Sequence, residues 1–289
     1  MGYLKESESL TASIAWSSIS SLSPPDNPDP SLEDVERMFY LTRKMKLSSV
    51  LDFPFYIFAF KNVSRVFTHQ WVRYRIAAHV QQSLRYVKVS TTIKDEPWFI
   101  IPPSILSQGA MAISEYVRAQ IESGRKYLEL LNRGIPPEDA RFVLPMAVKT
   151  HISSVMNAEE LLHVIDQRTC FDSQWEIRKA SYALLAGLYS ISPLIFKHAG
   201  PYCISEGICR GRRKGACYKQ AKELITKMFD AGKRLRVMLS KVEAGDYVRV
   251  DLTDELGFRV TDDVKREVAN TLGFPVELDY KVEVYVKKI

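Results

Sequence analysis

The chain has 289 residues, 46% of them hydrophobic and 26% charged, with a formal net charge of +6. These values are those of an ordinary globular protein, so the disordered and fibrous classes are excluded. No apolar run reaches the roughly 20 residues that a membrane-spanning helix needs. The first residues lack the apolar centre of a signal peptide, so we expect a cytoplasmic protein without membrane association.

The first predicted element is a helix that begins after a Ser- and Pro-rich loop. Ser31 is a capping residue, and the acids Glu33 and Asp34 follow in the first turn. Residues 53–60, FPFYIFAF, form an aromatic run that predicts a buried strand. We expect helix over 62–80 and a return to strand-like alternation over 85–90.

The middle of the chain is predicted to be mainly helical. Apolar residues recur at helical spacing from Met111 to about Arg133, and the prolines of RGIPPEDA end that helix. Residues 137–168 and 173–197 carry further long periodic patterns with few breakers. Early strands followed by helices predict an α+β, irregular α/β fold rather than a repeating βαβ order.

The C-terminal part has a different pattern. Residues 276–288 alternate strictly between apolar and polar side chains, which predicts a strand. Together with a strand at 247–252 and a helix at 261–274, this strand predicts a small β-α-β module. We therefore divide the chain into residues 1–240 and an appendage of residues 241–289, with a scaffold or oligomer-contact role expected for the appendage.

Residues 70–86, QWVRYRIAAHVQQSLRY, contain Arg73, Arg75 and Arg85 but no acid. A solvated helix usually alternates arginines with acids, so these cations need an anion from elsewhere. Arginine forks suit phosphate or carboxylate oxygens. The segment therefore predicts an anion site, and a basic surface patch is the alternative.

This segment resembles the signature RHRxxSxNExSxRY of the flavin-dependent thymidylate synthase family, and here it reads RYRIAAHVQQSLRY. Two later segments, 140–168 and DSQWEIRKA at 172–180, resemble further parts of that family without gaps. The resemblance covers roughly residues 45–220.

The resemblance implies an irregular α/β subunit of a homotetramer with active sites at subunit interfaces. It also implies a reaction, in which a methylene from methylenetetrahydrofolate is transferred to C5 of dUMP and FAD reduced by NADPH supplies the hydride. Charge-assisted donors suit a nucleotide phosphate, and positive charge suits a reduced flavin.

Residue by residue, the resemblance assigns dUMP contacts and flavin contacts. Arg168 is the implied catalytic residue, which faces and activates the pyrimidine, and Gln81 replaces a Glu of the motif. The implied dUMP-binding residues are Gln70, Gln81, Ser83, Arg85, Arg141 and Arg168. The implied flavin-binding residues are Arg73, Tyr74, Arg75, Asn157 and His163.

The flavin side departs from the family pattern. Tyr74, Ala78 and Val80 replace the His, Ser and Asn of the motif, Glu159 stands where an arginine is expected, and Ser48 stands where a histidine is common. Tyr74 could instead stack on the cofactor and donate from its hydroxyl. Glu159 could point to solvent and pair with a cation.

These departures leave two hypotheses open. The chain is either a working synthase with an altered flavin pocket, or a non-catalytic paralogue. A paralogue would bind a pyrimidine nucleotide, or would join an intact synthase subunit in a hetero-oligomer.

Two further features are weaker. Cys203, Cys209 and Cys217 lie in a glycine-rich loop after His198, but the spacing lacks a CxxC pair, so buried thiols are favoured over zinc or a disulfide and no metal site is predicted. The basic run RGRRK at 210–214 is short and is read as a solvated loop, with no nucleic acid as a partner.

Overall fold

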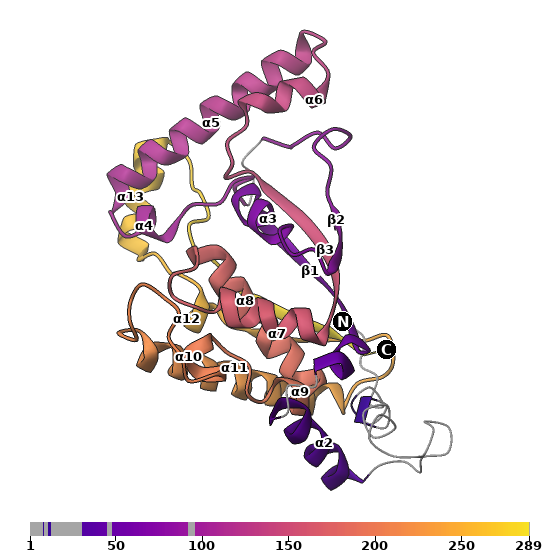
Figure 1. The fold of residues 1–289 in the computed structure, drawn as a ribbon. Coiled ribbons are helices and arrows are strands. Elements are labelled where there is room, and N and C mark those ends of the chain that lie inside the picture. The colour runs from indigo at the N-terminus through magenta and orange to yellow at the C-terminus, as the bar shows by residue number, and fades with distance from the viewer. Residues whose placement is uncertain (1–7, 9–10, 13–30, 45–47, 92–95, 289) are drawn as a thin grey trace.

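A computed structural model describes residues 8, 11–12, 31–44, 48–91 and 96–288 of the chain (Figure 1). The Ser- and Pro-rich loop before Ser31 lies outside these residues. Helices combine with two small antiparallel sheets, so the predicted α+β class is confirmed. Within the described residues, no helix is long and apolar enough to cross a bilayer.

The helical elements are α2 (Leu32–Lys44), η2 (Ser48–Asp52), α3 (Arg65–Trp71), α4 (Pro103–Leu106), α5 (Ala110–Asn132), α6 (Pro137–Ala140), η3 (Arg141–Val143), α7 (Ala158–Arg168), α8 (Trp175–Ile191), α9 (Pro193–Phe196), α10 (Tyr202–Ser205), α11 (Tyr218–Leu239), α12 (Thr253–Leu256) and α13 (Asp262–Leu272). The strands are β1 (Phe55–Ser64), β2 (Ala77–Gln81), β3 (Lys149–Asn157), β4 (Tyr247–Asp251) and β5 (Glu283–Lys287).

The larger sheet has the strand order β1-β3-β2, and both neighbours are antiparallel to the central β3. Its inner face packs against α3, α7 and α8, where Trp71 of α3 is fully buried. Its outer face leaves three apolar side chains exposed: Phe55 at 66%, Ile57 at 68% and Val80 at 76%. Among the described residues, none covers these three side chains on the outer face of the sheet.

Ser64 joins the sheet to the helices. Its Oγ accepts a hydrogen bond from the backbone N–H of Phe67 at 3.0 Å and so caps α3. Its own N–H and Oγ–H donate to the buried carboxylate of Glu176, in the first turn of α8, at 2.8 and 2.5 Å. The contact links α3 to α8, and α3 carries Gln70.

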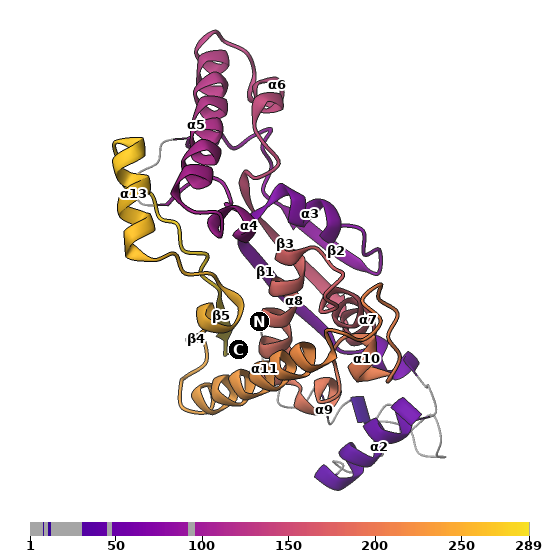
Figure 2. The ribbon, with the colours of Figure 1, turned by 90° about the vertical axis from the view of Figure 1, so that its left-hand side faces the viewer.

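The C-terminal segment packs against two different apolar clusters (Figure 2). Strands β4 and β5 pair with each other and belong to the cluster of α8 and α11. Helix α13 lies beside α5 and belongs to a second cluster with Ile113 and Val117. The predicted strand–helix–strand order is confirmed, and the domain boundary at residue 240 stays a prediction.

Several predicted elements are correct and others are wrong. Helices α2, α5, α8 and α13 and strands β1 and β4 confirm their patterns. Within 62–80, however, the helix covers only α3, and residues 77–81 form β2. Residues 85–90 form no strand, and β3 interrupts the helix expected over 137–168. Within 276–288, only Glu283–Lys287 pair as a strand, with an isolated bridge at Tyr280.

Candidate functional site

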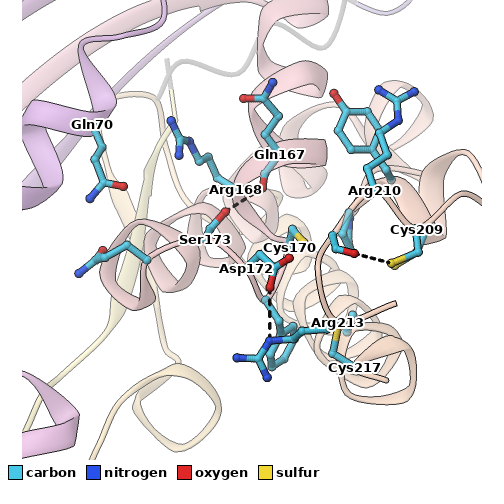
Figure 3. Close-up of a pocket in the computed structure, with 17 residues that line it drawn as sticks. Gln70, Gln167, Arg168, Cys170, Asp172, Ser173, Cys209, Arg210, Arg213 and Cys217 are labelled. Atoms are coloured by element: carbon cyan, nitrogen blue, oxygen red, sulfur yellow. Dashed lines mark hydrogen bonds and ion pairs between the residues drawn. The ribbon is translucent and has the colours of Figure 1, made fainter. Parts of the chain in front are cut away.

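A cavity of about 350 Å³ opens where α3, the end of α7, α10 and the start of α11 meet (Figure 3). Gln70 of α3 and Arg168, the last residue of α7, lie on one side of it. Arg210 and Cys209 lie on the opposite side, in the loop before α11. The structure thus brings the predicted Gln70 and Arg168 to one place.

The Arg168 guanidinium is held from inside the protein. Its Nε donates to the hydroxyl of Tyr74 at 2.6 Å, and its Cζ lies 5.2 Å from the centre of the Tyr74 ring. The Tyr74 hydroxyl in turn donates to Oε1 of Gln167 at 3.0 Å. Burial raises the pKa of Tyr74, although the neighbouring Arg168 opposes the rise, so the phenol stays protonated at neutral pH.

Three other predicted substrate residues lie elsewhere and do not line this cavity. The Arg85 Nε forms an ion pair with Oε2 of Glu138 at 2.5 Å, and the Arg141 Nε donates to the backbone carbonyl of Glu138 at 2.9 Å. The Ser83 Oγ accepts from the backbone N–H of Arg85 at 3.2 Å. The contacts with Glu138 place Arg85 and Arg141 at α6. Helix α6 and helix α10, which borders the cavity, lie well apart in both views (Figures 1 and 2).

More positive charge lies in the same region. Burial, and then the nearby charge of Arg141, lower the pKa of Arg65. Gln81 is half-buried, and its Nε2 donates to the hydroxyl of Thr68 at 2.9 Å, which links β2 to α3. Within one subunit, the predicted substrate residues therefore form two groups, one at the cavity and one near α6.

The predicted flavin residues are also divided. Arg73 and Arg75 are exposed in the turn between α3 and β2, and within the described residues no carboxylate forms an ion pair with either guanidinium. Asn157 is buried and is the N-cap of α7, since its Oδ1 accepts a hydrogen bond from the Glu160 N–H at 2.9 Å. Its Nδ2 donates to Asp52 at 2.7 Å.

Glu159 lies in the first turn of α7, close to Asp52 and Ser48. It is half-buried, and its pKa is raised by burial and by the nearby Asp52, while a hydrogen bond from Ser48 opposes the rise. The alternative of a solvated, cation-paired Glu159 stays a prediction, although no Lys or Arg among the described side chains forms an ion pair with it. The side chains of Asp52 and Glu159 make this position negative.

His163 belongs to a polar chain that starts at Arg168. Its Nε2 lies 2.9 Å from Nε2 of Gln167, and its Nδ1 lies 3.4 Å from the hydroxyl of Tyr202. The alternative in which the Tyr74 ring stacks on a cofactor does not fit this subunit, because the residue is only 6% exposed and its ring packs edge-on against Trp71. The sequence pattern did not reveal these hydrogen bonds, whose two partners are up to 94 residues apart in the sequence.

All four cysteines, Cys170, Cys203, Cys209 and Cys217, line the cavity as free thiols. The described residues contain no cluster of three or more side chains that could hold a metal ion. The basic run beside the cysteines is partly neutralised, since Arg210 pairs with Glu206 at 2.5 Å and Arg213 with Asp172 at 3.5 Å.

The structure is thus that of an α+β protein with a three-stranded antiparallel sheet and with arginines at a cavity and near α6. Residues 1–194 match the family described as thymidylate synthase complementing protein. The chain belongs to this family, and the resemblance found in its motifs is confirmed.

Individual relatives of the chain carry a more specific name. The flavin-dependent thymidylate synthase of Pyrococcus abyssi is 37% identical over 188 residues, which cover 63% of this chain and 76% of that protein. The one from Sulfolobus acidocaldarius is 40% identical over 157 residues, which cover 54% and 58%.

A solved structure has the same fold. It is the UMP/dUMP methylase PolB from Streptomyces cacaoi bound with 5-Br dUMP, which superposes with a TM-score of 0.57 at 17% identity. The match covers 66% of this chain and 88% of that one.

Proposed function

We propose that the protein is a flavin-dependent thymidylate synthase, which methylates C5 of dUMP with methylenetetrahydrofolate as the carbon donor. Family membership and the names of the relatives support this function. The observation that carries it is the Arg168 guanidinium, presented at a cavity beside Gln70 and held from behind by Tyr74.

Arg168 is the proposed catalytic residue. A guanidinium directed at a pyrimidine carbonyl stabilises the negative charge that develops on the ring when C5 acts as a nucleophile. The half-buried position of Arg168 strengthens this effect, because charge interactions are larger away from bulk water. Gln70 adds a neutral donor and acceptor that can orient the ring.

Ser83, Arg85 and Arg141 are the proposed phosphate-binding group. Two guanidinium forks and a hydroxyl suit the oxygens of a nucleotide monophosphate. The Arg85 guanidinium forms an ion pair with Glu138 in this structure, so a phosphate has to displace the carboxylate. Because the pair is exposed, its displacement costs little.

The residues present fit the phosphate part of a flavin dinucleotide. Arg73 and Arg75 are exposed cations, and these charges suit the two phosphates of FAD. Glu159 and Asp52 oppose an anion and lower the expected affinity. When bound, FAD reduced by NADPH would supply the hydride that completes the methyl group.

An oligomer would bring the two groups of substrate residues together. The cavity group and the α6 group lie apart within one chain, so a shared site needs a second subunit. The exposed apolar side chains Phe55, Ile57 and Val80 on the sheet suit such a contact. We propose a homotetramer, with a hetero-oligomer containing a related subunit as the alternative.

The first test is titration of the purified protein with FAD, with and without dUMP, followed by tritium release from dUMP labelled at C5. We expect saturable FAD binding and dUMP-dependent release. Arg168→Lys should lower release at least about a hundredfold, whereas the exposed Arg118→Lys on α5 should not change it.

The same titration separates the alternatives. Binding of dUMP without FAD would identify a non-catalytic, nucleotide-binding paralogue. If neither ligand binds, the proposed function is wrong.

A further inference from the structure

The Tyr74 hydroxyl lies between two polar groups at the edge of the cavity. It accepts from the Arg168 Nε at 2.6 Å and donates to the Gln167 Oε1 at 3.0 Å. Because the phenol has a single proton, the bond to Gln167 directs its lone pairs toward Arg168. The two bonds thus define one orientation of the hydroxyl.

The ring that carries this hydroxyl is also held in place. Tyr74 is 6% exposed, and its ring packs edge-on against Trp71 at 5.9 Å and against His163 at 6.2 Å between centroids. Trp71 is fully buried and donates from Nε1 to the hydroxyl of Ser154 at 3.0 Å. The arginine therefore contacts a rigid group of the core rather than a mobile surface side chain.

The contact uses only one of the five N–H groups of the guanidinium. With Nε bonded to Tyr74, the two terminal amino groups of Arg168 remain for the cavity, which this residue lines. Arginine loses rotamer entropy on binding, and a guanidinium that is already oriented loses less. A hydroxyl that stays neutral orients the cation without cancelling its charge.

Burial alone does not require this second bond. Tyr56 is equally buried, at 4% exposed, and its hydroxyl is satisfied by Ser192 alone at 2.8 Å. Gln167 would satisfy Tyr74 in the same way. The additional bond from a cation at the cavity edge sets Tyr74 apart from an ordinary core tyrosine.

We propose that Tyr74 is a positioning residue that orients the Arg168 guanidinium toward the pyrimidine of the nucleotide. The inference rests on the proposed function and deepens it, because it explains how the substrate-activating arginine is held.

The test is a double-mutant cycle on the dissociation constant for dUMP and on the rate of tritium release. Tyr74→Phe should weaken dUMP binding about tenfold or more, as expected for one hydrogen bond to a charged group. In an Arg168→Ala background, the same change should have no further effect on either quantity. Arg168→Lys removes the same hydrogen bond by changing its donor, since lysine lacks the planar Nε–H.

The matched control is Tyr56→Phe, which removes a buried hydroxyl that bonds to Ser192 and not to Arg168. It should lower the melting temperature about as much as Tyr74→Phe does and leave dUMP binding unchanged. A merely structural Tyr74 would give the same result in both variants, or additive losses with Arg168→Ala, and either result would overturn the proposal.

A second readout does not depend on the proposed function. Phenylglyoxal labelling followed by mass spectrometry measures the reactivity of Arg168 without any ligand. Tyr74→Phe should raise this reactivity several-fold, and Tyr56→Phe should not. If wild type binds no dUMP, the proposed function fails, but the labelling still decides whether Tyr74 holds Arg168. Unchanged reactivity of Arg168 in Tyr74→Phe would refute the positioning role.

Discussion

Replacement of the buried Glu176 by Gln should change how the stability of the protein depends on pH. Glu176 is 1% exposed, and its pKa is raised above the ordinary value of 4.5 by burial, even though the Ser64 hydroxyl and backbone N–H stabilise its charged form. In the pH range between 4.5 and the raised pKa, the folded protein therefore binds more protons at this site than the unfolded chain does.

The sign of the effect follows from this proton difference. The stabilisation from Glu176 is fully present below about pH 4.5 and is lost as the pH rises through the raised pKa. The slope is at most about 1.4 kcal/mol per pH unit. With about 2 cal/mol/K of unfolding entropy per residue, this corresponds to roughly 2 °C in Tm per pH unit for a chain of this length.

The assay is thermal unfolding of wild type and of Glu176→Gln at half-unit steps from pH 4.5 to 8. The Gln variant lacks the titration, so the difference in Tm between the two proteins should grow in favour of Gln as the pH rises. Glu115→Gln, an exposed substitution on α5, is the control and should leave the curve unchanged. Parallel curves for wild type and Glu176→Gln would refute the reasoning.

Three further predictions concern a charge, a glycine and a lysine. Glu159→Gln removes a half-buried negative charge from the proposed flavin side and should tighten FAD binding about tenfold, measured by fluorescence titration. Gly124→Ala places a Cβ 2.9 Å from the Trp98 ring and should destabilise the protein by about 1–3 kcal/mol in chemical denaturation, despite the helix preference for alanine. Burial, and then the charge of Arg178, lower the pKa of Lys179 to about 8, so stability should gain a contribution as the pH rises from 8 to 10.5, and Lys179→Met should abolish this gain in pH-dependent melts.

The elements that were predicted correctly have apolar residues at one clear period. In α5, the buried Ile113, Val117 and Tyr127 share one face, and in β4, Val248 and Val250 alternate with exposed neighbours. Strand β3 was missed because two of the four side chains that alternate on its inner face are polar. Thr150 and Ser154 point inward beside Ile152 and Met156, so the apolar alternation that identifies a strand is broken.

The site was predicted residue by residue but not in its pairings. The family motifs identified Arg85 and Arg168, and the structure places both at polar sites. Their partners Glu138 and Tyr74 are 53 and 94 residues away in the sequence, so no local pattern links them. Such pairs form only when the sheet brings distant segments together.

Tyr74 illustrates why a departure from a motif is not by itself a loss. Judged against the motif, it replaces a histidine and counts against cofactor binding. In the fold, its hydroxyl reaches the Nε of Arg168 at 2.6 Å, and its ring fills the core beside Trp71. The substitution thus ties the cofactor motif to Arg168, the proposed substrate-activating residue, whereas the change at Glu159 places negative charge beside Asp52. On this reasoning, flavin affinity depends on Glu159 more than on Tyr74.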